Sequence, residues 1–255
     1  TADGVVHRCV NLGWGVFDVR TALEETVGLP VVVVNDANAA AMGEAWKGGG
    51  RGSENVVFIT LGTGVGAGIV IGGGNFWRGR TSDAIDRPKA DQIGMLATVM
   101  NCIYVSEIFR NAGMKTQILT PFECGNMTKL FSKDRANKYF EHGMVVFFAG
   151  GIGQPYFSTD TTITLMAIEM DADCILLAKS IDGVYDSDPK VNPNAKKYDE
   201  ISIQEVIDKQ LGVVDLTASI MCMEHKMPMA VFSLNEKDGI ANAMQGKING
   251  TIVTV

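Results

Sequence analysis

The sequence lacks paired cysteines, a basic run and a long apolar run. Its five cysteines are scattered among 255 residues without a C-x-x-C pair, so neither a zinc site nor a disulfide framework is indicated, and a reducing, cytoplasmic location is expected. A formal net charge of -7 argues against nucleic-acid and membrane-surface partners. No uninterrupted apolar run reaches the roughly 18 residues of a membrane-spanning helix. Because the chain starts at Thr1 rather than at a methionine, without a basic-then-apolar leader, we expect a fragment.

A glycine-rich loop occupies the middle of the chain. The apolar run Met144–Ala149 is followed by glycines at 150, 151 and 153, and a helical pattern begins at Thr161. Such a strand, glycine loop and helix direct backbone N–H groups at an anion. Ser158, Thr159 and Thr161 add hydroxyl donors, and Asp160 adds one carboxylate. The alternative is an ordinary loop before a capped helix.

The next strand, Cys174–Ala178, places Lys179 at its carboxyl end, where open α/β sheets bind their ligands. The segments GGIGQPYFSTDT and KSIDGVYDSDP resemble the UMP-binding and ATP-binding loops of bacterial UMP kinases, which belong to the amino acid kinase family. The resemblance extends from about residue 69 to residue 255. It implies a three-layer α/β/α sandwich around a mainly parallel sheet.

Two further segments agree with this resemblance. Gly72–Gly74 follow a predicted strand, with Arg78 four residues later, which suits contact with phosphate; the alternative is a surface turn with a solvated arginine. The segment RPKADQIGMLATVMN places Asp91 before a helix predicted over 92–111, whose apolar stripe suits the core or a subunit contact. In UMP kinases this aspartate binds UMP, and the helix lies near the dimer contact.

The first 73 residues resemble a different family. A β-branched run, Val31–Val34, ends at Asn35-Asp36 before an alanine-rich helix, Ala37–Trp46, so Asp36 is either a helix cap or a functional carboxylate. The strands predicted over 56–60 and 68–71 flank the glycine turn LGTGVG and form a hairpin. The segments NLGW, GLPVVVVNDANAAAMGEAWKGGGRG and VVFITLGTGVGAGIVIGG resemble ROK sugar kinases, glucokinases in particular.

The ROK resemblance implies that Asp36 is a general base, that Asn35 holds the sugar, and that Gly62, Thr63 and Gly64 contact ATP phosphate. The two resemblances change over at I-V-I-G-G, so we expect a chimera of a segment 1–73 and a domain 74–255. The lysine loop K-x-S-G-E of UMP kinases has no counterpart in this sequence. We expect the first 70 residues to pack irregularly or as an appended subdomain.

The function implied by the larger resemblance is Mg-dependent phosphoryl transfer from ATP to UMP in pyrimidine nucleotide biosynthesis. It implies a hexamer with GTP and UTP as effectors, and no protein residue is assigned as a metal ligand. The alternatives are a nucleotide-binding chimera without turnover and a ROK-type glucokinase that uses Asp36. The implied UMP site comprises Gly73, Asp91, Ile152, Gly153, Gln154, Pro155, Tyr156, Phe157, Ser158 and Thr159. The implied ATP site comprises Gly74, Arg78, Lys179, Tyr185 and Asp188, with Asp160, Lys179 and Arg78 as the catalytic residues.

Overall fold

The computed structural model describes residues 5–6, 17–18, 21, 25, 55–61, 66–77, 85–212 and 214–255. The predicted strand and helix within residues 31–46 lie outside this part of the chain. Near the N-terminus, β1 (Val5–Val6) pairs with β2 (Phe17–Asp18) in an antiparallel two-stranded sheet.

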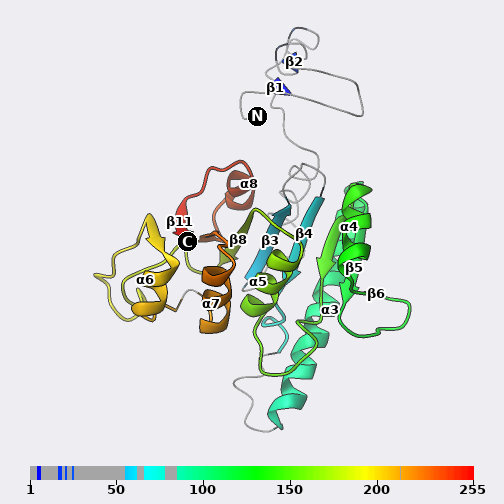
Figure 1. Ribbon diagram of the computed structural model, residues 1–255, viewed down its shortest axis with the longest axis horizontal. Helices are drawn as coiled ribbons and strands as arrows, with labels where there is room; N and C mark the ends of the chain where they lie inside the picture. The colour runs from blue at the N-terminus through cyan, green and yellow to red at the C-terminus, as the bar shows by residue number, and fades with distance from the viewer. Residues whose placement is uncertain are drawn as a thin grey trace.

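The main sheet has nine strands in the order β6-β5-β7-β4-β3-β8-β10-β11-β9 (Figure 1). Five of its eight pairings are parallel and three are antiparallel. The predicted mixed α/β fold around a mainly parallel sheet is therefore confirmed. The strands are β3 (Asn55–Leu61), β4 (Gly66–Ile71), β5 (Thr116–Thr120), β6 (Lys129–Leu130), β7 (Val145–Phe148), β8 (Cys174–Lys179), β9 (Glu200–Ser202), β10 (Met229–Ser233) and β11 (Gly250–Thr254).

The predicted hairpin of β3 and β4 lies in the centre of this sheet. β3 is antiparallel to both of its neighbours, β4 and β8, whereas β4 is parallel to β7. The expectation that all residues before 70 pack irregularly or as an appended subdomain is therefore wrong for these two strands. Their backbone donors and acceptors are paired within the main sheet.

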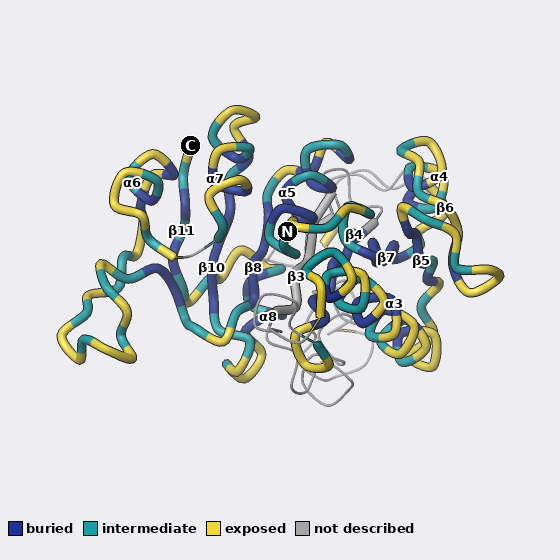
Figure 2. Tube along the Cα trace, turned by 90° about the horizontal axis from the view of Figure 1, so that it is seen from below, coloured by how far each residue is buried: buried dark blue, intermediate teal, exposed yellow. Residues whose placement is uncertain are grey.

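Helices cover both faces of the sheet (Figure 2). One core cluster contains residues of α3 and α8, and the other contains residues of α4, α5, α6 and α7. Because side chains alternate along a strand, β7 contributes Val145 and Phe147 to the first cluster and Val146 and Phe148 to the second. The helices are α3 (Arg87–Asn111), α4 (Lys133–Glu141), α5 (Thr159–Glu169), α6 (Ile203–Asp208), α7 (Leu216–Glu224) and α8 (Gly239–Met244).

The predicted start of α6 is confirmed by its cap, whereas the predicted start of α3 is not confirmed. Ser202 accepts a hydrogen bond from the Glu205 backbone N–H at 3.1 Å, as its capping pattern predicts. The start of α3 was predicted at residue 92 and is wrong by five residues, since the helix begins at Arg87. Pro88 is compatible with this first turn because its missing N–H would be unpaired there in any case.

The apolar stripe of α3 is not part of the core. Leu96, Met100 and Ile103 are 52%, 48% and 36% exposed, whereas Val99 and Cys102 are buried. By length and composition α3 could cross a membrane, the one such helix among the residues described, although 33% of its apolar stretch is buried. Core helices of soluble proteins pass the same test, so this is weak evidence for a membrane. Of the two alternatives for the stripe, the core is wrong for Leu96, Met100 and Ile103, and a subunit contact stays a prediction.

Candidate functional site

Three of the predicted segments follow strands that end at the same edge of the sheet. β4 is parallel to β7, and β3 is antiparallel to both β4 and β8, so β4, β7 and β8 all point in one direction. Their carboxyl ends lead into Gly72–Gly74, into the loop 150–158 and, at Lys179, into the loop 180–198. This is the edge at which α/β sheets bind ligands.

The first glycine turn lies directly against α3. A Cβ atom on Gly73 would be 2.8 Å from the Gly94 carbonyl oxygen and 2.9 Å from the Ala97 Cβ, so only glycine fits. The Gly73 carbonyl accepts hydrogen bonds from the backbone N–H groups of Phe76 and Trp77, both at 3.0 Å. Gly73 is buried and Gly74 is exposed, so Gly74, unlike Gly73, is open to a ligand.

The loop 150–158 is attached to α3 by a buried threonine. Gly150, Gly151 and Gly153 have φ values of 86°, 64° and 82°, in the region that favours glycine. The Gly150 N–H donates to the Thr98 Oγ1 at 2.8 Å, and Thr98 Oγ1 donates to the Met95 carbonyl at 2.7 Å. The loop therefore begins at a position set by α3.

The same helix holds the far part of the loop through Asp91. Its Oδ2 accepts hydrogen bonds from the Tyr156 backbone N–H and from Arg87 Nε, both at 2.8 Å. The Arg87 guanidinium also lies 5.5 Å from the centre of the Tyr156 ring. Tyr156 has a φ of 75°, which is unusual for a residue with a side chain. Asp91 thus lies at the predicted UMP-binding loop, and its side chain is 13% exposed.

The N-terminus of α5 is held by a carboxylate from another helix. Ser158 caps α5 by accepting from the Thr161 N–H at 3.2 Å. Its hydroxyl donates to Asp215 Oδ2, which also accepts from Thr161 Oγ1 at 2.9 Å. Asp215 Oδ1 accepts from the Ala218 N–H at 2.9 Å, so this one side chain caps α7 and holds the first turn of α5.

The predicted catalytic residues Asp160 and Lys179 form an ion pair. Lys179 Nζ donates to Asp160 Oδ2 at 3.0 Å, and the two side chains are 12% and 17% exposed. Asp160 lies in the first turn of α5, where backbone N–H groups favour a negative charge. The pair places a cation at the carboxyl end of β8, beside the start of α5.

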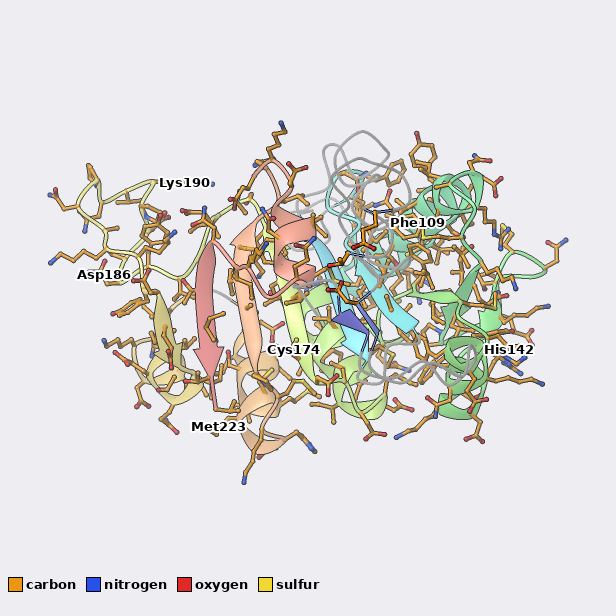
Figure 3. The ribbon with its side chains drawn as sticks, turned by 90° about the horizontal axis from the view of Figure 1, so that it is seen from above. Phe109, His142, Cys174, Asp186, Lys190 and Met223 are labelled. Carbon is orange, nitrogen blue, oxygen red and sulfur yellow. The ribbon has the colours of Figure 1, made fainter. Side chains whose placement is uncertain are left out.

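The loop 180–198 folds onto itself. Tyr185 Oη donates to Asp182 Oδ1 at 2.8 Å, and Lys197 Nζ lies 3.3 Å from Asp182 Oδ2. Burial raises the pKa of Asp182, but the hydrogen bonds from Tyr185 and Lys197 lower it by a larger amount. The net shift of this pKa is therefore downward. Asp188 Oδ1 accepts from the Lys190 N–H at 2.9 Å. Figure 3 shows Lys190 and Asp186 in this loop, at the end of the molecule away from His142.

Part of the predicted site lies outside the described residues. This holds for Arg78 and for the whole alternative sugar site of Asn35, Asp36, Gly62, Thr63 and Gly64. Within the described residues, no group of three His, Cys, Asp or Glu side chains could hold a metal ion.

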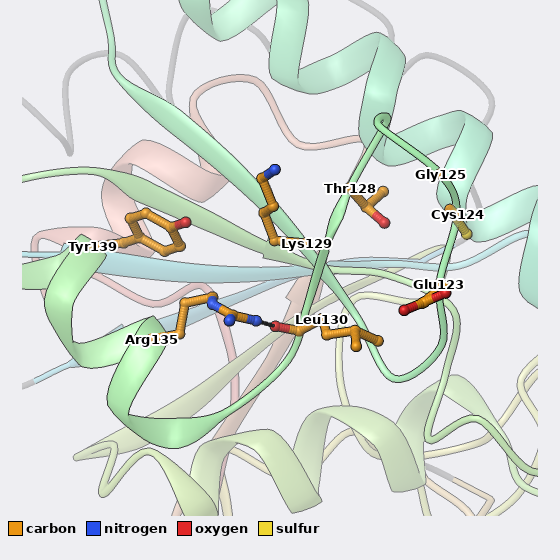
Figure 4. A pocket seen from close by; sticks show the side chains of 8 residues that line it. All are labelled: Glu123, Cys124, Gly125, Thr128, Lys129, Leu130, Arg135 and Tyr139. Carbon is orange, nitrogen blue, oxygen red and sulfur yellow. Dashed lines mark hydrogen bonds between the residues drawn. The ribbon is translucent and has the colours of Figure 1, made fainter.

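A cavity of about 590 Å³ lies beside α4 and β6, the terminal strand of the sheet (Figure 4). None of its lining residues belongs to the predicted site. Figure 4 shows Arg135 extending to the Leu130 carbonyl, to which its guanidinium donates. The lining residues are Glu123, Cys124, Gly125, Thr128, Lys129, Leu130, Arg135 and Tyr139.

Sequence reasoning missed the residues that hold the loops in place. Thr98 lies 52 positions from Gly150, and Asp215 lies 57 positions from Ser158. Arg87 had no predicted role of its own and was noted only as the first residue of the segment RPKADQIGMLATVMN. No local pattern marks Thr98 or Asp215 as a partner of these loops, because the fold alone brings the segments together.

Two family models match the chain: the amino acid kinase family over residues 57–233 and the ROK family over residues 1–84. The fold of this chain is similar to the folds of several solved structures. UMP kinase from Ureaplasma parvum has 35% identity and a TM-score of 0.71, over 74% of this chain and 81% of the other. UMP kinase from Bacillus anthracis has 33% identity and a TM-score of 0.69, over 72% and 78%. Uridylate kinase from Archaeoglobus fulgidus has 26% identity and a TM-score of 0.52, over 67% and 74%.

Proposed function

This chain belongs to the amino acid kinase family, and we propose that it is a UMP kinase-like phosphotransferase that converts ATP and UMP into ADP and UDP for pyrimidine nucleotide synthesis. The observation that carries the proposal is the ion pair of Asp160 and Lys179, which lies where the two predicted nucleotide loops adjoin. Similar structures named UMP kinase support the choice of acceptor.

On the acceptor side, we assign UMP to the loop 150–158 and to the face of α3 beside it. Backbone N–H groups of a glycine loop and of a helix start suit its phosphate. Asp91 can only accept hydrogen bonds, so it would face a hydroxyl or an N–H of the nucleoside and not the phosphate. Among the described residues Thr159 makes no side-chain hydrogen bond, so its hydroxyl is open to a ligand.

On the donor side, we assign the phosphates of ATP to Gly74, Arg78 and Lys179, and the rest of the nucleotide to the loop with Tyr185 and Asp188. Phosphoryl transfer depends on positioning and on stabilising the charge of the transferred group. Asp160 would hold the Lys179 ammonium in place for this purpose. Magnesium is bound in kinases largely through substrate phosphates, so it would enter with ATP as part of the substrate.

The two alternatives differ from this proposal in what residues 1–73 contribute. If the chain is a chimera without the lysine loop of UMP kinases, it would bind nucleotides without turnover. The ROK match over residues 1–84 supports the other alternative, a sugar kinase with Asp36 as its base.

The test is ADP release from MgATP by the purified chain with UMP, with glucose and with neither. Release that requires UMP is the expected result. Release that requires glucose would replace the proposal with the sugar-kinase alternative. If neither acceptor stimulates release, calorimetric titration with UMP separates a nucleotide-binding chimera from a chain without nucleotide function.

We also infer that the exposed apolar stripe of α3 is a subunit contact. Leu96 and Met100 lie one turn apart on one face of α3 and are about half exposed. Light scattering of the Leu96→Lys/Met100→Lys variant should show a smaller assembly than the unchanged chain. An unchanged mass would contradict the inference.

A further inference from the structure

The loop between β8 and β9 is closed at its base by a two-stranded neck, which we define as residues 184–186 and 196–198. Tyr185 forms an antiparallel bridge with Lys197. The Tyr198 N–H donates to the Val184 carbonyl at 2.9 Å, and the Asp186 N–H donates to the Lys196 carbonyl at 3.0 Å. The neck therefore sets the direction in which residues 187–195 extend.

One hydroxyl on β11 binds both strands of the neck. Thr251 Oγ1 accepts from the Val184 N–H at 2.8 Å and donates to the Tyr198 carbonyl at 2.5 Å. A threonine hydroxyl has one donor and two acceptor sites, so both bonds form at once. Thr251 is 0% exposed, so water cannot replace either bond.

The neck also packs directly on this side chain. A Cβ atom on Gly183 would lie 2.6 Å from Thr251 Oγ1 and 2.9 Å from Lys197 Cδ, so the close approach requires glycine. The contact lies at the functional edge of the sheet, because β11 is antiparallel to β10. The first residues of β11 therefore lie where β8 and β10 end. Thr251 of β11 pairs with Val231 of β10, and Ser233 of β10 pairs with Lys179 of β8.

We propose that Thr251 is a positioning residue for ATP, which holds the neck so that the loop presents Tyr185 and Asp188 next to Lys179. The inference rests on the proposed function, since that assigns this loop to ATP. Thr251 itself would not touch the nucleotide. Its loss should weaken the use of ATP and spare UMP, because the UMP loop is held by α3.

The test compares Thr251→Val, Thr251→Ser and the control Thr254→Val. Valine keeps the shape but leaves the buried Val184 N–H and Tyr198 C=O without partners, which should raise the KM for ATP about tenfold. The KM for UMP should change less than twofold. Serine keeps the hydroxyl and should restore the KM for ATP. Thr254 lies on the same strand, away from the neck, and its valine variant should match the unchanged chain.

Hydrogen exchange of the Val184 amide provides a readout that does not require turnover. It should be at least tenfold faster in Thr251→Val and unchanged in Thr254→Val. If the unchanged chain binds ATP without phosphorylating UMP, the proposed function fails, and the ATP dissociation constants of the same variants test Thr251. Equal rises of both KM values, or no change in the KM for ATP, would overturn the role of Thr251 and leave the proposed function in place. Absence of ATP binding by the unchanged chain would overturn both.

Discussion

The two loops that we assign to nucleotides, both at the carboxyl ends of the strands, keep their shapes in different ways. The loop 150–158 depends on glycines with positive φ and on side chains of α3, because Thr98 and Asp91 each accept one of its backbone N–H groups. The loop 180–198 bonds mainly to itself and is attached to the sheet by Thr251. One loop is held from outside along its length, and the other is held at its base.

This difference predicts that changes in the two loops separate kinetically. A substitution on α3 should alter the handling of UMP, and a substitution at the base of the other loop should alter the handling of ATP. Among the described residues, the ion pair of Asp160 and Lys179 lies where the two loops adjoin, so its loss should affect both.

The largest effect is expected for Asp160→Asn. It removes the carboxylate charge that pairs with the Lys179 ammonium, and kcat for UMP phosphorylation should fall about 10² to 10³-fold, as for the loss of other transition-state contacts. The matched control is Asp171→Asn, which removes the charge that pairs with Lys133. This pair lies on the surface, since the side chain of Asp171 is 79% exposed and that of Lys133 is 42% exposed. Equal kcat values in the two variants would contradict the role of Asp160.

Asp91→Asn should weaken UMP selectively. The change removes the charge that faces Arg87 and places a donor where an acceptor was, so the KM for UMP should rise about 30-fold while the KM for ATP stays within twofold. Steady-state kinetics with each substrate varied in turn measure this. Asp86→Asn is the control, since Asp86 lies one turn earlier, is exposed and makes no capping hydrogen bond. A comparable rise in the KM for ATP would show that the two loops do not act separately.

Thr98→Val is the counterpart of Thr251→Val on the UMP side. Valine leaves the buried Gly150 N–H without an acceptor, at a cost of about 1–3 kcal/mol, so the KM for UMP should rise about tenfold. Thr116→Val removes another buried threonine hydroxyl, bonded to Ser106 and Arg110 at the opposite end of β5, and should leave both KM values unchanged. If Thr98→Val and Thr251→Val affect the same substrate, the two loops are not independent.

Tyr185→Phe should have the smallest effect. It removes one bond to the partly exposed Asp182, and the KM for ATP should rise only about two- to threefold. The pKa of Asp182 is lowered in the folded chain. Its contribution to the stability of the folded chain is therefore present above the ordinary pKa of 3.8 and is lost as the pH falls through the pKa of the folded state. Carboxyl NMR titration should show a higher Asp182 pKa in the variant, and an unchanged pKa would show that Tyr185 does not contribute to the shift.

Much of the fold followed from local patterns. The glycines at 150, 151 and 153 predicted the loop before α5, and Ser202 with Glu205 predicted the start of α6. The short strand β9 and the short helix α8 were not predicted, because three or six residues carry little periodicity. The stripe of α3 was read correctly as apolar, but the sequence could not show which side of the helix faces the sheet.

The sequence by itself determined most of the segments that adopt strands, helices and glycine turns, because those follow from residues near one another in the chain. It also determined that Asp160 lies at the start of a helix and that Lys179 lies at the end of the strand that follows. Only the tertiary structure decided that β3 is inserted antiparallel in the middle of the sheet and that Thr98 and Thr251 support the two loops. These contacts join residues 52 and 67 positions apart. Any buried hydroxyl could make them, so the path of the chain alone selects which one does.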